Sequence, residues 1–180
     1  MRDPKERTLS AFLDKAARKN GQYVKRHCCN AKNATCGEEA NSSFLGFLRV
    51  VRKCKDPHWN PQTLRIDDVF KPYINFVGHF DRIQDDTKKL LKSLKYDGIH
   101  DNNLWTTFGA SGWGKYGNES IFSKGTKAKH QTSATANLRR YYNVTSERLV
   151  EKIFSADYND PILNFTRFSL FDTKTKELEG

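Results

Sequence analysis

The chain has no long apolar run and no leader-like start. It contains no stretch of about 18 apolar residues, the length that a membrane-spanning helix requires. It also lacks the basic start and apolar core of a signal peptide. No internal repeat, zinc-finger spacing or RNA-recognition signature is present. These absences argue against a membrane span within this sequence, a repeat array and the common nucleic-acid-binding modules.

The sequence has few acidic residues relative to basic ones. Its 31 Lys and Arg against 21 Asp and Glu give 180 residues a formal charge of +10. This charge favours anionic partners, such as a phosphorylated cofactor, an acidic glycan or a nucleic acid. The basic residues are scattered rather than gathered on one helix, so we expect no nucleic-acid partner. The length corresponds to one domain.

Cysteines are also few, and their state depends on the compartment in which the chain folds. Cys28, Cys29, Cys36 and Cys54 lie in one stretch, which predicts one or two disulfides in an oxidising lumen, with three pairings open. Free buried thiols are the alternative for a cytosolic chain. A zinc site with His27 fits less well, because Cys28 and Cys29 are adjacent, and no metal is predicted. Five N-glycosylation patterns support a lumenal chain; they begin at Asn33, Asn41, Asn118, Asn143 and Asn164.

Apolar periodicity and capping residues predict helices joined by polar segments. Residues 20–40 and 97–132 are predicted to be loops, and Tyr73–Val77 a short buried strand. The predicted helices begin near Pro4, at Asn41 (ending near Cys54), at Asp81, and after Asn143 as N-cap.

A glycine-rich segment matches the spacing of a nucleotide-binding P-loop. Gly109–Lys115 fits G-x-x-x-x-G-K, but Tyr116 stands where the motif has a metal-binding Ser or Thr. No amphipathic helix follows. A flexible glycine-rich loop is therefore the better interpretation.

The first residues of the chain predict a phosphate-binding site. Arg2 directly precedes a helix that begins near Pro4 and carries Ser10. A guanidinium offers a rigid fork of donors to an oxyanion, and a helical hydroxyl can add a further hydrogen bond. The alternative is an ordinary amphipathic helix preceded by a solvated arginine.

The segment around this arginine resembles a known family. Arg2-Asp-Pro, Glu6-Arg, Ser10-Ala-Phe and Asp14-Lys resemble the 3′-phosphate-binding motif of sulfotransferases that use 3′-phosphoadenosine-5′-phosphosulfate (PAPS), particularly the Golgi carbohydrate sulfotransferases. Further segments resemble this family in the same order, over about residues 1–165: they are 56–62, 73–81, 130–132 and 138–142.

The resemblance implies an α/β, P-loop-like sulfotransferase fold with mostly helices around a small parallel sheet. It implies a domain over 1–165 that lacks the N-terminal strand and 5′-phosphosulfate loop, and a polar tail over 166–180. The activity implied is sulfuryl transfer from PAPS to a hydroxyl of a glycan acceptor, without a metal. The family's lumenal Golgi location implies a membrane anchor N-terminal to this chain. Because the 5′ loop is missing, we expect little or no activity from the chain alone.

Individual site residues follow from the resemblance. Arg2 and Ser10 would hold the 3′-phosphate. Lys127, Lys129 and Thr132 precede a helix and can reach phosphate groups, with a solvated basic loop as the alternative.

His58 is a candidate catalytic base or acceptor-site residue, against a structural role in its turn. Trp59 can stack on a sugar or adenine, or pack in the core. After Gln62 the family's usual cysteine pair is replaced by residues 63–68, so the family's disulfide pattern does not carry over. A different hypothesis is a non-catalytic basic module that binds polyanions, such as sulfated glycan or nucleic acid, with salt-sensitive affinity independent of Arg2 and Ser10.

Overall fold

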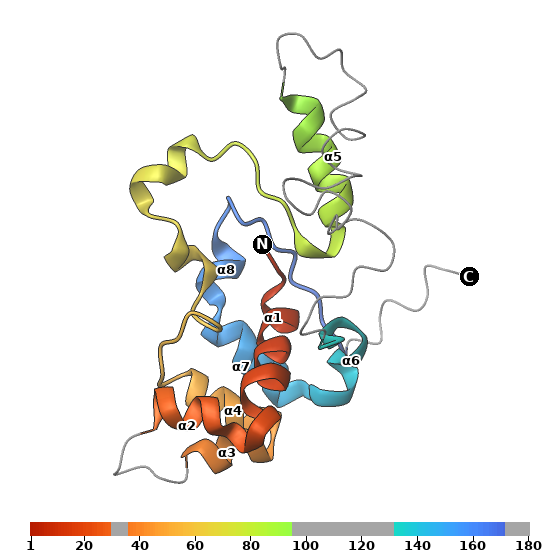
Figure 1. The fold of residues 1–180 in the computed structure, drawn as a ribbon. Coiled ribbons are helices and arrows are strands. Elements are labelled where there is room, and N and C mark those ends of the chain that lie inside the picture. The colour runs from red at the N-terminus through yellow and green to blue at the C-terminus, as the bar shows by residue number, and fades with distance from the viewer. Residues whose placement is uncertain (30–35, 95–131, 172–180) are drawn as a thin grey trace, which may run out of the picture. The chain divides into compact units, whose positions relative to one another are not determined.

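The structure is a computed structural model that describes residues 1–29, 36–94 and 132–171 (Figure 1). It divides into two compact units. The larger unit contains residues 2–73 and the chain from Thr132 onward, and the smaller one contains Met1 and the segment from Ile74. Arg2, Ser10, His58 and Thr132 belong to the larger unit, and Lys127 and Lys129 fall within the sequence range of the smaller one.

Helix α1 (Pro4–Ala11) begins where the sequence predicts. Asp3 is its N-cap, and the Asp3 Oδ1 accepts hydrogen bonds from the backbone N–H groups of Lys5 (2.8 Å) and Glu6 (3.2 Å). The helix continues as a π-helical segment, η1 (Phe12–Ala16). The predicted apolar face packs in the core, because Leu9, Phe12 and Ala16 are buried.

Helices replace much of the loop predicted over residues 20–40. After a 3₁₀ turn, η2 (Arg18–Gly21), come α2 (Gln22–Cys28) and α3 (Cys36–Ser42), so that prediction was wrong. Two disulfides, Cys28–Cys54 and Cys29–Cys36, join these short helices to each other and to the segment after α4. The helices are too short and polar to show apolar periodicity, and the disulfides and core contacts hold them instead. The predicted disulfides are confirmed, with all four cysteines paired.

Helix α4 (Phe44–Val51) starts three residues later than predicted. Ser43 rather than Asn41 is its N-cap, and the Gly46 N–H donates to the Ser43 Oγ over 3.0 Å. Its apolar face is buried, and the Phe47 ring meets Trp59 edge-on, with the centroids 5.4 Å apart. Trp59 is only 1% exposed and donates its indole N–H to the Cys54 carbonyl over 2.8 Å. Trp59 therefore packs in the core and does not stack on a ligand.

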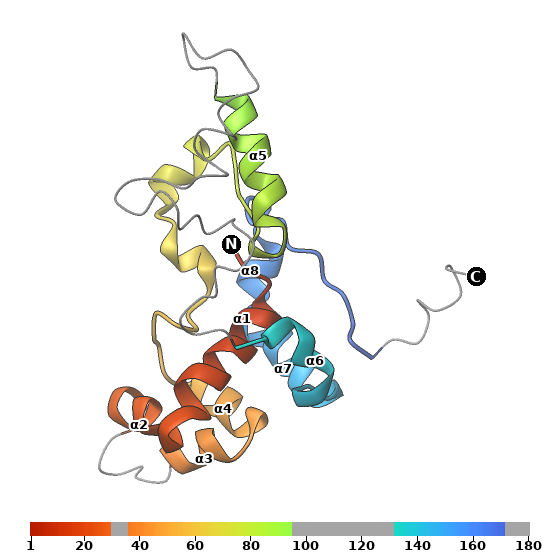
Figure 2. The same ribbon diagram turned by 45° about the vertical axis from the view of Figure 1, so that its right-hand side comes forward.

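The C-terminal helices of the larger unit are α6 (Ala134–Tyr141), α7 (Val144–Ile153) and α8 (Ser155–Asn159). Asn143 forms the predicted N-cap of α7, as a capping box with Ser146. Helix α1 packs against α6 and α7, and α7 also packs against α4 (Figure 2). Leu170, within the predicted polar tail, is buried, and its N–H donates to the Glu147 carboxylate over 2.8 Å.

A buried lysine fixes the start of α1. Lys5 has no exposed surface, and its Nζ lies 3.0 Å from a Glu147 carboxylate oxygen and 2.8 Å from one of Glu151. The same ammonium donates to the Phe168 carbonyl. The Lys5 carbonyl accepts a hydrogen bond from the Tyr142 hydroxyl over 2.8 Å. The first turn of α1 is therefore held by α7 and by the segments that precede and follow α7.

The predicted strand at Tyr73–Val77 is not formed. The first stretch of the larger unit, residues 2–73, ends in two 3₁₀ segments, η4 (Gln62–Arg65) and η5 (Asp68–Tyr73), and Tyr73 is 80% exposed. Residues 74–79 have no regular structure, and the described residues contain no strand and hence no parallel sheet. An isolated apolar run gains little from an extended conformation unless a neighbouring strand takes up its backbone hydrogen bonds.

The smaller unit contains a helix near the predicted position. A 3₁₀ turn, η6 (Phe80–Arg82), leads into α5 (Ile83–Ser93), with acidic residues early and Lys92 late as predicted. The buried Asp86 accepts hydrogen bonds from the His79 N–H (2.8 Å) and the Arg82 Nε (3.2 Å). Among the helices in the described ranges, none has the length and apolar character to cross a membrane.

Candidate functional site

The backbone of Arg2 is clamped by a buried glutamine. Gln62 is 5% exposed; its Oε1 accepts the Arg2 N–H over 3.0 Å, and its Nε2 donates to the Arg2 carbonyl over 2.7 Å. These two hydrogen bonds join residues 60 positions apart in the sequence. Gln62 lies in one of the family-like segments, but it had no predicted role, because a single sequence does not show which backbone groups a side-chain amide hydrogen-bonds to.

A second contact joins α1 to the same segment. The Arg7 guanidinium donates to the Asn60 carbonyl over 2.5 Å. Burial lowers the pKa of Arg7 to about 10, although the nearby Asp157 carboxylate acts in the opposite direction. Asp157 has no exposed surface, and its Oδ1 accepts hydrogen bonds from the backbone and hydroxyl of Thr63, over 2.9 and 3.2 Å. The segment 56–63 is thus attached to α1 and to α8, and it fixes the position of Arg2.

Two predicted cofactor residues lie together. The Ser10 Oγ is 2.9 Å from the Thr132 Oγ1, although these residues are 122 positions apart. Ser10 belongs to α1, and Thr132 lies just before α6. Two hydroxyls at this distance can share one proton and turn their remaining donor toward a bound oxyanion. Lys127 and Lys129 lie outside the described residues, as does the glycine-rich segment Gly109–Lys115.

Glu6 and Ser10 are four residues apart and lie on one face of α1, whereas Arg2 precedes the helix and its N-cap, Asp3. The Arg2 Nε lies 3.5 Å from a Glu6 carboxylate oxygen, with side-chain exposures of 23% and 10%. Glu6 stands one turn from Ser10 on this face. The structure therefore places a carboxylate in contact with Arg2 and on the same helix face as Ser10, and sequence analysis gave Glu6 no role.

The cap of the same helix has an unusual carboxylate. Burial raises the pKa of Asp3 from 3.8 to about 6, and the hydrogen bonds from the Glu6 and Lys5 N–H groups offset only part of this shift. The neighbouring Glu6 carboxylate acts in the same direction as burial. The start of α1 thus holds two carboxylates beside Arg2.

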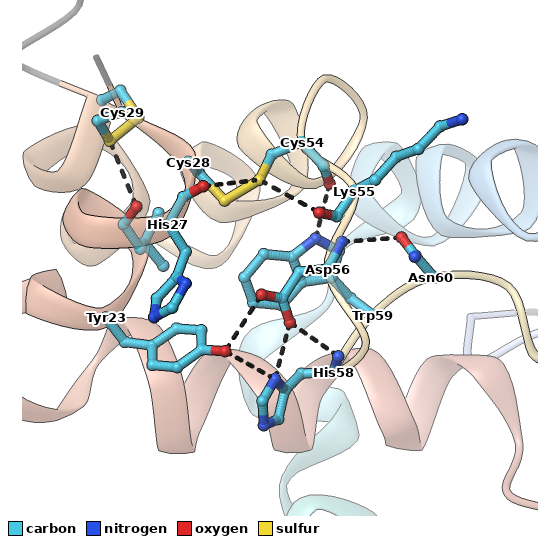
Figure 3. Close-up of a disulfide and its surroundings, with 12 residues drawn as sticks. Tyr23, His27, Cys28, Cys29, Cys54, Lys55, Asp56, His58, Trp59 and Asn60 are labelled. Atoms are coloured by element: carbon cyan, nitrogen blue, oxygen red, sulfur yellow. Dashed lines mark hydrogen bonds and ion pairs between the residues drawn. A yellow bond between two sulfur atoms is a disulfide. The ribbon is translucent and has the colours of Figure 1, made fainter. Parts of the chain in front are cut away.

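His58 belongs to a hydrogen-bonded cluster with Asp56 and Tyr23 (Figure 3). The His58 Nδ1 lies 2.7 Å from the Asp56 Oδ1 and 3.0 Å from the Tyr23 hydroxyl, and that hydroxyl donates to the Asp56 Oδ2 over 3.1 Å. Tyr23 comes from α2, and its ring also stacks on His27 at a centroid distance of 4.3 Å. Sequence analysis singled out His58 but not the two residues that hold it.

The cluster fixes the imidazole and leaves part of it open. Asp56 is 5% exposed, whereas the His58 side chain is 40% exposed. Burial by itself would raise the pKa of Asp56, but hydrogen bonds from the His58 N–H, the His58 ring and the Tyr23 hydroxyl lower it below its ordinary value. A carboxylate at Nδ1 favours the tautomer in which Nδ1 carries the proton and Nε2 accepts one. His58 therefore has the local arrangement of a base, with Asp56 as its support.

No set of three or more His, Cys, Asp or Glu side chains in the described ranges is arranged to hold a metal ion. The cysteines that with His27 formed the alternative zinc hypothesis are all in disulfides.

These features define a disulfide-linked helical domain with an arginine and a hydroxyl pair that can bind an anion. The model of the sulfotransferase family matches residues 1–160, so the chain belongs to this family and is an enzyme by family resemblance. Comparisons with curated proteins and with solved structures gave no significant match.

Proposed function

We propose that the protein transfers a sulfuryl group from PAPS to a hydroxyl of a glycan acceptor, and that Arg2, Ser10 and Thr132 hold the 3′-phosphate of the nucleotide. The observation that carries this proposal is the 2.9 Å contact between Ser10 and Thr132. These two residues come from separate family-like segments that were assigned to the same nucleotide, and the fold brings them together.

The residues present fit a phosphate group. Arg2 supplies a guanidinium whose backbone is fixed by Gln62, and the hydroxyls of Ser10 and Thr132 supply neutral donors. Lys129 and Lys127 would add charge from the segment before Thr132. A 5′-phosphosulfate loop, which in this family precedes the arginine motif, and a small parallel sheet would complete the proposed P-loop-like α/β site, and the described residues form neither.

His58 is proposed as the base that takes the proton of the acceptor hydroxyl. Its Nε2 would accept this proton, while the Asp56 carboxylate stabilises the imidazolium that forms. When bound, PAPS supplies the sulfuryl group and leaves as the bisphosphate nucleotide. Because Nδ1 is held by Asp56 and Tyr23, the ring would not have to reorient before the proton moves.

The Golgi lumen is the proposed location. The two disulfides support an oxidising compartment. Asn164, which begins one of the glycosylation patterns, is exposed, as an acceptor site requires, whereas the Asn143 amide is engaged in capping α7. A membrane anchor N-terminal to the sequence would complete this arrangement.

Binding of adenosine 3′,5′-bisphosphate tests the nucleotide site. We would titrate the full chain, with its disulfides formed, by calorimetry and by NMR, and compare Arg2→Ala and Ser10→Ala with the exposed controls Arg26→Ala and Ser42→Ala. We expect weak, saturable binding that falls about tenfold or more for Arg2→Ala and less for Ser10→Ala, because a charged hydrogen bond contributes more than a neutral one. Binding that is indifferent to Arg2 and collapses with salt would instead indicate a general polyanion-binding module.

A further inference from the structure

The acidic residue on the phosphate-binding face of α1 has no place in the proposed function. Glu6 is 8% exposed, and its carboxylate lies 3.5 Å from the Arg2 Nε. An acceptor-only group at this point does nothing to bind a phosphate and competes for the same guanidinium. Its position needs an explanation of its own.

We propose that Glu6 is an internal competitor of the nucleotide, a carboxylate that holds the Arg2 guanidinium until a 3′-phosphate displaces it. This inference rests on the proposed function, because it assigns a regulatory residue to the same site. Glu6 thereby sets the affinity of the site and favours ligands with enough negative charge to displace it.

The geometry supports competition. The Glu6 carboxylate contacts Arg2 and lies one helical turn from Ser10, so a phosphate bound by both residues would come close to the Glu6 side chain. The carboxylate is mostly shielded from solvent, and water therefore screens its repulsion of a phosphate less than on an open surface. Asp3 adds a second nearby carboxylate, whereas Lys5, the nearest lysine in sequence, is taken up by Glu147 and Glu151. The cation that Glu6 pairs with is the Arg2 guanidinium.

An arginine–glutamate pair elsewhere provides a matched control. Glu39 of α3 lies 3.4 Å from the Arg49 Nη1, a pair of the same chemistry, but with side-chain exposures of 43% and 60%. Glu39→Gln changes the net charge and removes an ion pair as Glu6→Gln does, without touching α1. A difference in nucleotide affinity between the two variants is therefore due to the position of Glu6 next to Arg2 and not to the change in net charge.

The test measures the affinity of the full chain for adenosine 3′,5′-bisphosphate and for adenosine 5′-monophosphate, which lacks the 3′-phosphate. Glu6→Gln is expected to bind the bisphosphate at least about threefold more tightly than the wild type, the scale of a partly shielded ion pair, with no gain for the monophosphate. Glu39→Gln should leave both affinities unchanged. Glu6→Ala is a second variant for the case that Glu6→Gln folds poorly, and it should show the same gain in affinity for the bisphosphate.

Other outcomes separate the two proposals. If the wild type binds the bisphosphate through Arg2 but neither Glu6 variant binds it more tightly, the competitor role is wrong and the nucleotide site stands. Weaker binding by the Glu6 variants would show that Glu6 positions Arg2 for the nucleotide, which also contradicts competition. If neither the wild type nor the Glu6 variants bind, the proposed function fails together with this inference.

Discussion

Replacing Asp3 by asparagine should stabilise the protein at neutral pH. Asparagine caps a helix as well as aspartate does, so the hydrogen bonds from the Lys5 and Glu6 N–H groups are retained. The substitution removes the charge that burial disfavours. The stabilisation should therefore come from relief of the desolvation that raises the pKa of Asp3.

The size of the effect follows from the pKa shift. The Asp3 pKa rises from 3.8 to about 6 on folding, which is a cost of about 3 kcal/mol once the group is ionised in both states. The folded state holds the Asp3 proton more tightly, so this cost is absent below pH 3.8 and grows as the pH rises toward 6 and above. From the same two pKa values, the cost is about 1 kcal/mol at pH 4.5 and about 3 kcal/mol at pH 7.5.

Urea unfolding at the two pH values measures this difference, with the disulfides intact. The free energy of unfolding of Asp3→Asn should exceed that of the wild type at pH 7.5, and the gain should shrink by about 2 kcal/mol at pH 4.5. Asp67→Asn, at an exposed position, is the control and should show little change at either pH. A gain for Asp3→Asn that is the same at both pH values, or a loss at pH 7.5, would refute the reasoning.

Three other predictions follow from contacts of α1 and the disulfides. Removing the Cys28–Cys54 disulfide, which closes a loop of 26 residues, by the double substitution Cys28→Ser and Cys54→Ser should lower the free energy of unfolding by about 3.5 kcal/mol, and an unchanged urea midpoint for this variant would argue against it. Lys5→Met leaves two carboxylates without their buried cation and should cost about 3–5 kcal/mol in urea unfolding; a neutral result would mean that the cation is not needed there. Gln62→Leu removes both hydrogen bonds to the Arg2 backbone and should cost about 1–3 kcal/mol and weaken nucleotide binding in calorimetry, whereas unaltered affinity would show that Gln62 does not position Arg2.

Sequence reasoning was most successful where one helix carries its own signals. Pro4 and the apolar spacing after it predicted α1, and Asn143 predicted the start of α7. Reasoning from composition also predicted disulfides, but the pairing of Cys28 with Cys54 required the fold, because spacing alone leaves three possibilities.

The failures concern structure that depends on distant partners. Tyr73–Val77 has the apolar, β-branched composition of a strand, yet a strand forms only where a neighbour completes its hydrogen bonds. Helices α2 and α3 are short and are held by disulfides and by buried residues such as Val24, so their own sequence gave little signal. Tertiary context overrode local propensity in both places.

In the candidate site, too, residues close together in the sequence could be predicted, whereas their distant partners mostly could not. Arg2 and Ser10 could be selected from their order and chemistry, because they lie close together in the sequence, Arg2 just before α1 and Ser10 on it. The partners that give these residues their geometry, Gln62 and Thr132, come from segments 60 and 122 residues away. Thr132 was selected by family resemblance, whereas Gln62 was found only from its hydrogen bonds.

A structure of the protein with adenosine 3′,5′-bisphosphate tests the central claim most directly. The account predicts that the 3′-phosphate lies within hydrogen-bonding distance of the Arg2 guanidinium and the Ser10 Oγ, with the Glu6 carboxylate turned away from Arg2. A nucleotide bound elsewhere on the chain, with the Arg2–Glu6 pair intact, would contradict it.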